Sequence, residues 1–489
     1  MSVAILLWDL LELPQLLSFS PVAFGDPGSN LTISYLVSHG YRPVVDFNYP
    51  YGLLAIFANM AWFRVAPLTP VSYQLASVIC QLGVACAIAR VARALAFGPL
   101  QLIFLFIAIG RAVMPTYPNF AHGLEAILIC LAVAEQARGA RANALALTTA
   151  AVFAKPSMGF VYSALLLTLM ALDLYRRRRV SLATWFKQIE PAAIAGISLC
   201  VLLATVFGVD VLWRTVLPIS GVATYRTLKT GFFTGIGAQF WKPAGVNWHY
   251  YAGTTIGLWA VATVYLLWGA VPAAWRLWEN LGTKSDSTRI RRDEMVFSCA
   301  LLHLAFIFLF FGPAGSWNNY SYLLIAGAAA VPIERHIHRY ALCALIVVAV
   351  STYYAVVRES IAAWRSTSRT PVTANLWSPT EVRDEWSRVL ALCKGRRTVV
   401  VHYAGAVEIL YPEFERPTGT YFIVGLMNAA EIQGEVARIE SADVIVLPHG
   451  GMPPTWAAGG YALTPETERA IAQFKHTEES TYFSVYERR

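Results

Sequence analysis

Two carboxylates lie in one short stretch near the start of the chain, together with an aromatic-proline turn. The stretch runs from Gly25 to Gly52, GDPGSNLTISYLVSHGYRPVVDFNYPYG, and follows the first apolar segment. Asp26 opens it, and Asp46 precedes an aromatic-proline turn that contains Tyr49 and Tyr51. A positioned carboxylate can act as a general base that takes a proton from a hydroxyl group. Asp26 and Asp46 also allow structural interpretations, as a helix-capping acid and as a polar loop residue.

More ionisable side chains lie at the ends of later apolar segments. Arg111 lies near the end of one segment, and His122 and Glu125 begin the next, about one turn apart on one side of a helix. Lys155 follows in a Lys-Pro-Ser joint between two segments. Charges near an apolar membrane layer are costly unless they are paired or line a wet cavity. A cavity with two acids and several cations at one face suits an anionic ligand and proton transfer.

The same residues allow plainer roles. Arg111 and Lys155 could simply extend to the membrane interface from helix ends. Glu125 could serve only as an ion-pair partner of Arg111 or His122. The seven cysteines show no metal-ligand spacing, and six of them lie in apolar segments. We therefore predict no metal site.

The composition is that of an integral membrane protein. Of the 489 residues, 56% are hydrophobic and only 14% are charged, against about 25% charged residues in soluble domains. The apolar residues form long segments without the alternation of apolar and polar positions that is typical of a membrane β-barrel. The spans are therefore expected to be helical.

The sequence predicts about eleven spans, because a helical span needs roughly 20 apolar residues. They cover residues 3–24, 71–92, 98–115, 120–137, 142–155, 157–175, 191–211, 253–272, 295–312, 320–333 and 340–358. Arginine groups at 176–179, 289–292 and 335–339 lie in short joints between spans, and such joints stay in the cytoplasm. The net charge of +8 is thus explained by topology, and no nucleic-acid partner is expected.

Residues 51–66 are apolar but short, and prolines follow at 67 and 70. If this segment lies along the membrane interface, the later basic groups all face the cytoplasm, so the interfacial position is favoured. The first span, 3–24, contains Asp9 and Glu12, which should face other helices. Because the predicted number of spans is odd and the basic joints are cytoplasmic, the N-terminus is expected in the cytoplasm and the C-terminus outside. The Arg- and Ala-rich composition indicates a bacterial inner-membrane protein, with its C-terminal domain in the periplasm.

Two outer loops are predicted within a transmembrane module of residues 1–360. The first, 25–69, contains a short helix from Ser29 to His39, capped by Ser29 or Asn30. The second, 212–252, is aromatic and basic and includes Trp241 and Lys242.

Residues 380–489 have a mixed, soluble-like composition. Strands at Thr398–Tyr403 and Asp443–Leu447 alternate with helices at Ala429–Ile439 and Pro465–Phe474, which indicates a small α/β domain. The predicted fold is mainly α, a transmembrane helical bundle with a small C-terminal α/β domain.

These motifs resemble the GT-C superfamily of polytopic glycosyltransferases, especially bacterial members that use polyprenyl-phosphate sugars. An acid follows the first span at Gly25-Asp26-Pro27, and a Gly-Tyr-x-Pro-x-x-Asp-Phe stretch with an aromatic-proline turn occupies Gly40 to Tyr51. Arg111 ends one outer helix before Glu125 opens the next, and Lys155 precedes a proline between two later spans. An outer α/β domain at the C-terminus is also common in that family. Pro27 stands where many relatives carry a second acid, which weakens any inference of metal binding.

The resemblance implies transfer of a sugar from a polyprenyl-phosphate donor to an acceptor hydroxyl at the outer face. Asp26 would be the general base, with Glu125 as a second catalytic carboxylate. Arg111, Lys155 and Lys242 would hold the donor phosphate and neutralise it as it leaves. The implied substrate-binding residues are Asp46, Tyr49, Tyr51, Tyr117, His122 and Trp241.

The resemblance also defines the expected partners. The acceptor would be a lipid, a glycan or a protein, and the polyprenyl tail would lie between helices, open to membrane lipid. No cofactor is expected, although a divalent cation such as Mg²⁺ is compatible with this chemistry.

Two other functions fit a chain of this kind. A transporter or flippase of an anionic lipid or solute would be supported by broken helices and inverted repeats, and the sequence shows no repeat. An O-antigen polymerase or ligase also handles lipid-linked glycans and has a long outer loop, but it would not need an acid directly after the first span.

Overall fold

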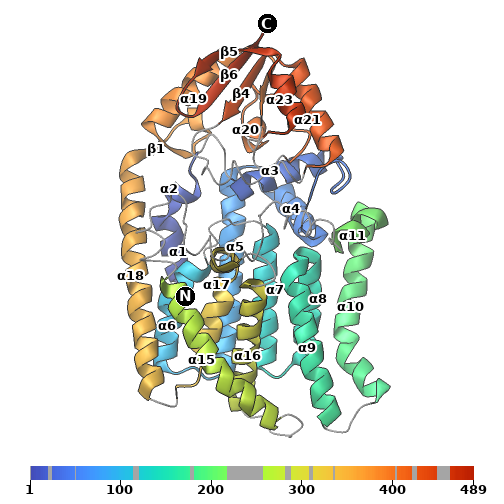
Figure 1. Cartoon of the computed structure of the whole chain (residues 1–489), viewed down its shortest axis with the longest axis vertical. Coiled ribbons are helices and arrows are strands. Elements are labelled where there is room, and N and C mark those ends of the chain that lie inside the picture. The colour runs from blue at the N-terminus through green and yellow to red at the C-terminus, as the bar shows by residue number, and fades with distance from the viewer. Residues whose placement is uncertain are drawn as a thin grey trace.

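The computed structural model describes residues 2–19, 25–49, 51–113, 120–176, 181–216, 257–280, 288–307, 312–333, 336–401, 405–420, 427–448 and 463–489. The protein is mainly helical and has a small mixed sheet near its C-terminus. Figure 1 shows an upright helical bundle with the sheet above one end, here called the domain end, opposite the far end. The predicted fold class is confirmed.

Long apolar helices form the bundle. They are α5 (Pro70–Ala94), α6 (Pro99–Val113), α7 (Phe120–Ala137), α8 (Arg141–Ala154), α9 (Pro156–Arg176), α10 (Leu182–Phe207), α15 (Gly257–Asn280), α16 (Thr288–Phe306), α17 (Gly312–Ala330) and α18 (His336–Ser366). In the described part of the chain, five helices are long and apolar enough to cross a membrane, within α5, α9, α10, α15 and α18. The chain is thus a multi-pass membrane protein, while the total of eleven spans stays a prediction.

The first predicted span, residues 3–24, is broken. The structure has two helices there, α1 (Ser2–Leu11) and α2 (Leu13–Leu16). Pro14 lies in the first turn of α2, where a residue without an N–H group is well tolerated. Phe19 then packs in the core of the C-terminal domain. Asp9 and Glu12 are both buried, as expected for acids that face other helices.

Buried ion pairs join the helices at the far end. Arg141, at the start of α8, donates to both oxygens of Glu294 in α16, at 2.8 and 2.5 Å. Arg276 of α15 donates to both oxygens of Asp293, at 2.7 and 2.6 Å. Gln136 of α7 donates to Glu294 at 2.9 Å. Because a buried charge without its partner is strongly destabilising, these contacts fix how four helices meet.

Three helices lie at the domain end, between the bundle and the sheet or beside it (Figure 1). They are α3 (Gly25–Ser38), α4 (Leu53–Val65) and α11 (Val209–Val216). α4 starts next to Gly52, whose N–H group donates to the carbonyl of Ala154. Near its other end, Trp62 donates to the carbonyl of Ser72 at the start of α5. Both ends of α4 therefore lie at the domain end, and α4 does not cross the bundle.

Two predicted boundaries in these segments at the domain end are wrong. The helix expected from Ser29 begins at Gly25, so that Asp26 and Pro27 belong to its first turn. Acidic side chains and proline are both favoured in a first turn, by the helix dipole and by the unpaired N–H groups there. The loop expected from residue 212 begins as α11, after a left-handed Gly208 (φ +94°) has ended α10.

The C-terminal domain begins directly after α18. A short hairpin of β1 (Thr367–Arg369) and β2 (Trp377–Pro379) precedes a sheet of β3 (Thr398–Val400), β4 (Val444–Pro448), β5 (Phe474–Glu479) and β6 (Phe483–Arg488). The strand order is β3-β4-β6-β5, with β3 and β4 parallel and the other neighbours antiparallel. The helices are α19 (Thr380–Cys393), α20 (Gly405–Leu410), α21 (Ala429–Ser441) and α23 (Pro465–Ile471). The predicted helix Pro465–Phe474 is therefore too long, because Phe474 is a buried residue that starts β5.

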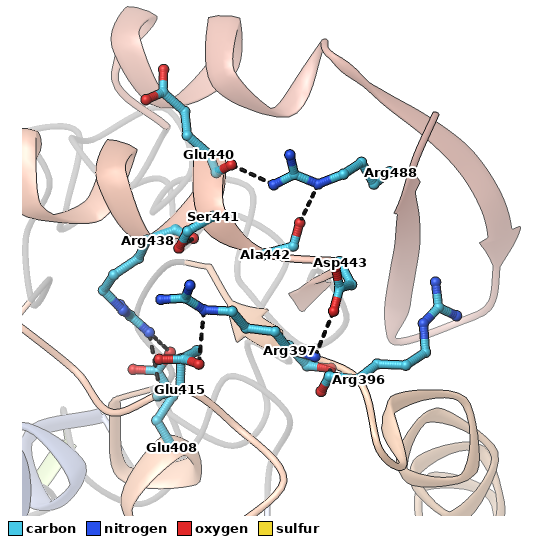
Figure 2. Close-up of polar contacts among 11 residues, drawn as sticks. Arg396, Arg397, Glu408, Glu415, Arg438, Glu440, Ser441, Ala442, Asp443 and Arg488 are labelled. Carbon is cyan, nitrogen blue, oxygen red and sulfur yellow. Dashed lines mark hydrogen bonds and ion pairs between the residues drawn. The ribbon is translucent and has the colours of Figure 1, made fainter.

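Arginines tie the sheet to its helices (Figure 2). Arg438 of α21 pairs with the buried Glu408 of α20, and Arg488 of β6 donates to the carbonyls of Glu440 and Ala442. Burial raises the pKa of Glu408 to about 8. The positive charge of Arg438 lowers this pKa, and the negative charge of Glu435 raises it further. α20 packs against α3, so this buried cluster lies next to the helix that carries Asp26.

The far-end ion pairs make a testable contribution to stability. Arg276→Gln leaves the buried carboxylate of Asp293 without its bidentate partner, and we expect the free energy of unfolding to fall by roughly 3–5 kcal/mol. Arg90→Gln is the matched control, because Arg90 is half exposed and its pair with Glu135 should contribute only about 0–1 kcal/mol. Thermal unfolding of the purified protein, followed by size-exclusion chromatography, measures both. Equal melting temperatures for the two variants would show that the far-end ion pair contributes no more to stability than the pair of Arg90 with Glu135.

Candidate functional site

A short segment at the domain end joins the C-terminal domain to the bundle. We call Asn48, Tyr49, Tyr51 and Gly52 the strap. Its lower end is fixed by a hydrogen bond of 3.0 Å from the Gly52 N–H to the carbonyl of Ala154. A Cβ atom on Gly52 would lie 2.0 Å from the carbonyl oxygen of Phe153. Only glycine allows this approach of two backbones, so the strap lies directly against the end of α8.

The strap is also held by its tyrosines. Tyr49 is buried in a cluster with Phe153 and residues of α3, α4 and α10. Its ring packs edge-on against Tyr51, at 5.8 Å between centroids. Tyr51 in turn packs edge-on against His122, at 5.7 Å. These ring contacts connect the aromatic turn to the start of α7.

Lys155 lies at the centre of the resulting cluster. It follows the last residue of α8, before Pro156 begins α9, and is only 5% exposed. Its Nζ lies 2.9 and 3.2 Å from the two ring nitrogens of His122, and 5.8 Å from the centroid of the Tyr51 ring. An ammonium group has donors and no acceptor, and a neutral imidazole has a single acceptor nitrogen, so only one of these two short contacts can be a hydrogen bond from Lys155 to His122.

Glu125 provides the negative charge of the cluster. It is 1% exposed, and its Oε2 lies 3.7 Å from Lys155 Nζ. Its Oε1 accepts a hydrogen bond of 3.3 Å from the backbone N–H of Met158, in the first turn of α9. The contact with Lys155 adds a partner that the sequence does not indicate, beside the alternatives Arg111 and His122. The spacing of one turn between His122 and Glu125 puts both on the side of α7 that faces Lys155.

Asp46 lies in the turn that precedes the strap. Its Oδ2 accepts a hydrogen bond of 2.6 Å from the backbone N–H of Arg42, which closes the turn before the strap. The Arg42 side chain pairs with Asp210 of α11 at 2.5 Å. Asp46 thus has a structural role in the loop, and its role in substrate binding stays a prediction.

The other predicted site residues lie where side chains are outside the described part of the structure. Asp26 is in the first turn of α3, and Arg111 is in the last turn of α6. Tyr117, Trp241 and Lys242 lie outside the described residues. Of the residues predicted from sequence, the structure therefore brings together Tyr49, Tyr51, His122, Glu125 and Lys155.

Two residues with important contacts were missed by the sequence analysis. Gly52 was noted only as the end of the aromatic turn, although its lack of a side chain lets the strap reach α8. Glu431 of α21 was not singled out, although its Oε2 accepts the N–H of Asn48 at 2.8 Å. The local signal for Glu431 is a capping box with Asn428, which predicts a helix start but no long-range partner.

No family model matches this chain. No curated protein matches it either. Among solved structures, the chain is similar to the crystal structure of ArnT from Cupriavidus metallidurans in the apo state, at 12% sequence identity and a TM-score of 0.40. This match covers 99% of this chain and 97% of that one.

The close approach at Gly52 predicts a specific effect of substitution. Gly52→Ala would drive its Cβ into the carbonyl of Phe153 and should displace Tyr51 from Lys155. We expect a thermal destabilisation of roughly 1–3 kcal/mol, as for other overpacked sites. Gly98→Ala is the control, since a Cβ there meets nothing nearer than 3.9 Å. A Gly52→Ala variant as stable as Gly98→Ala would show that the strap is not held against α8.

Proposed function

We propose that this protein transfers a sugar from a polyprenyl-phosphate donor to an acceptor hydroxyl at the domain end of the membrane. The observation that supports this most directly is the buried cluster of Lys155, His122, Glu125 and Tyr51. It lies where two helix ends, the first outer loop and the bilayer-spanning bundle converge. The likeness of its motifs to those of GT-C glycosyltransferases supports the same conclusion.

Lys155 is proposed to bind the donor phosphate. A buried cation at a membrane interface is stable when it faces anions or polar groups, and Lys155 already lies among a carboxylate and an imidazole. A phosphate oxygen could replace or join these acceptors. As the bond from the anomeric carbon to the phosphate oxygen breaks, negative charge develops on the phosphate, and a preorganised cation stabilises it. Arg111 and Lys242 are proposed to assist at the same phosphate.

Asp26 is proposed to be the general base. The oxygen of the acceptor hydroxyl would attack the anomeric carbon, its proton would pass to the Asp26 carboxylate, and the lipid phosphate would leave with the electron pair. α3, which carries Asp26, packs against α4 and α5 at the domain end. The first turn of a helix favours the ionised form of a carboxylate, which is the form that accepts a proton.

The remaining predicted residues have supporting roles in this proposal. Glu125 holds Lys155 and keeps the cluster close to neutral before the donor arrives. Tyr49, Tyr51 and His122 line the approach to Lys155, with Asp46, Tyr117 and Trp241 proposed as further contacts to the sugar or acceptor. The domain end would face the periplasm, with the N-terminus in the cytoplasm.

Lys155→Gln tests the phosphate-binding role. Removing one preorganised charge from a developing anion typically costs about 10²–10³ in rate, and we expect a loss of that size. The assay incubates the purified protein with a panel of polyprenyl-phosphate sugars and reads the product by mass. Lys475→Gln is the control, because Lys475 is exposed on β5. Full activity of Lys155→Gln would rule out this role, and lipid translocation without any product would favour a flippase.

Asp26→Asn tests the base. A general base contributes about 10²–10⁴ in rate, so we expect transfer to fall by that factor while expression and folding are kept. Asp384→Asn is the control, since Asp384 lies exposed on α19. The same product assay, at saturating donor, gives the rate. Unchanged turnover of a purified Asp26→Asn protein would remove Asp26 as the base.

A further inference from the structure

A single carboxylate of the C-terminal domain holds the upper end of the strap. Glu431, in the first turn of α21, is 1% exposed. Its Oε2 accepts the backbone N–H groups of Asn48 at 2.8 Å and of Asn428 at 3.1 Å. Its Oε1 accepts the backbone N–H and the hydroxyl of Thr420, both at 3.0 Å. One buried side chain therefore joins the strap, α21 and the segment before it.

Weaker contacts surround this junction. The Thr420 hydroxyl lies 3.4 Å from the carbonyl of Asn48. The side-chain amide of Asn428 donates to the carbonyl of Val45, at 3.3 Å. Asn48 thus uses both its N–H and its carbonyl toward the C-terminal domain, which fixes its backbone in position and in orientation.

The strap is consequently held at both ends by different parts of the chain. Glu431 holds Asn48, and the carbonyl of Ala154 holds Gly52. Between them lies Tyr51, which packs on His122 and under Lys155. Asn48 and Tyr51 are only three positions apart in the sequence, and Tyr49, next to Asn48, packs against Tyr51 at 5.8 Å between ring centroids. These contacts give a shift of Asn48 a direct route to the Tyr51 ring.

We propose that Glu431 is a positioning residue. By holding Asn48 it sets the position of the Tyr51 ring beneath the Lys155 ammonium, and it thereby couples the C-terminal domain to the site. The inference deepens the proposed function and rests on it for its kinetic consequence. That Glu431 holds the strap in place rests only on the hydrogen bonds described above.

Three substitutions separate this role from simple helix capping. Glu431→Gln keeps one oxygen that can accept the N–H groups of Asn48 and Asn428, but it loses the charge and turns an NH2 donor toward Thr420. Glu431→Asp keeps the charge in the first turn of α21 but is one methylene too short to reach Asn48. Glu431→Ala removes both. Stabilisation of the helix dipole by charge predicts that Asp is tolerated better than Gln, whereas positioning predicts the reverse. A capping box, in which Gln can replace Glu, protects the N–H of Asn428 but not that of Asn48.

Hydrogen exchange of the full-length protein gives the first readout. We expect faster exchange of the Asn48 amide, in peptides covering residues 42–49, for Glu431→Asp and Glu431→Ala but not for Glu431→Gln. Exchange in β3 and β4 should be unchanged in Glu431→Asp. Glu385→Ala is the matched control, because Glu385 also accepts a backbone N–H, that of Tyr482 at 3.2 Å, but entirely within the C-terminal domain.

Transfer kinetics give the second readout. Misplacement by about 1 Å can cost 10²-fold, so we expect kcat/KM to fall about 10- to 100-fold for Glu431→Asp and Glu431→Ala, with Glu431→Gln and Glu385→Ala close to the parent. Loosening of the strap without loss of rate would overturn the coupling, as would equal behaviour of Asp and Gln. If the parent protein transfers no sugar, the proposed function fails, and the exchange series still decides whether Glu431 fixes the strap.

Discussion

The hydrogen bond from Gly52 to the carbonyl of Ala154 is the contact on which the arrangement of this site depends. It joins a segment near the start of the chain to the residue just before Lys155. The approach is so close that any side chain at position 52 would collide with the Phe153 carbonyl. Because two backbones define this contact, it fixes position more rigidly than contacts between flexible side chains would. The aromatic turn and the buried lysine are thereby held together.

The cluster around Lys155 shows how a membrane protein accommodates a buried cation. The lysine follows the end of α8, where the helix gives way to a proline-initiated helix and the side chain can turn toward α7. Glu125 and His122 come from one face of α7, and Tyr51 closes the cluster from the strap. The members come from three segments, so the cluster exists only when α7, the end of α8 and the strap are assembled.

The two ends of the bundle differ in their polar contacts. At the far end, bidentate arginine–carboxylate pairs hold helices to one another, and such pairs combine charge with fixed geometry. At the domain end, single charges lie next to aromatic rings and backbone groups, and the C-terminal domain reaches in through Glu431. The far end is therefore suited to holding the bundle together, whereas at the domain end the polar contacts also link the bundle to the C-terminal domain.

The sequence by itself determined the fold class, because long uncharged apolar segments can satisfy their backbone groups in a membrane only as helices. It also indicated His122, Glu125 and Lys155 as candidates, since ionisable residues at the ends of apolar segments are costly unless they are paired or line a wet cavity, and the family resemblance added Tyr51. It could not determine that α3 starts at Gly25. Residues 25–28 have the composition of a loop, but the first turn of a helix accepts both an acid and a proline. Nor could the sequence give the ion-pair partner of Glu125 or the link from Glu431 to Asn48. Those depend on which segments meet across 30 to 383 positions of sequence, and only the packing of the folded chain decides that.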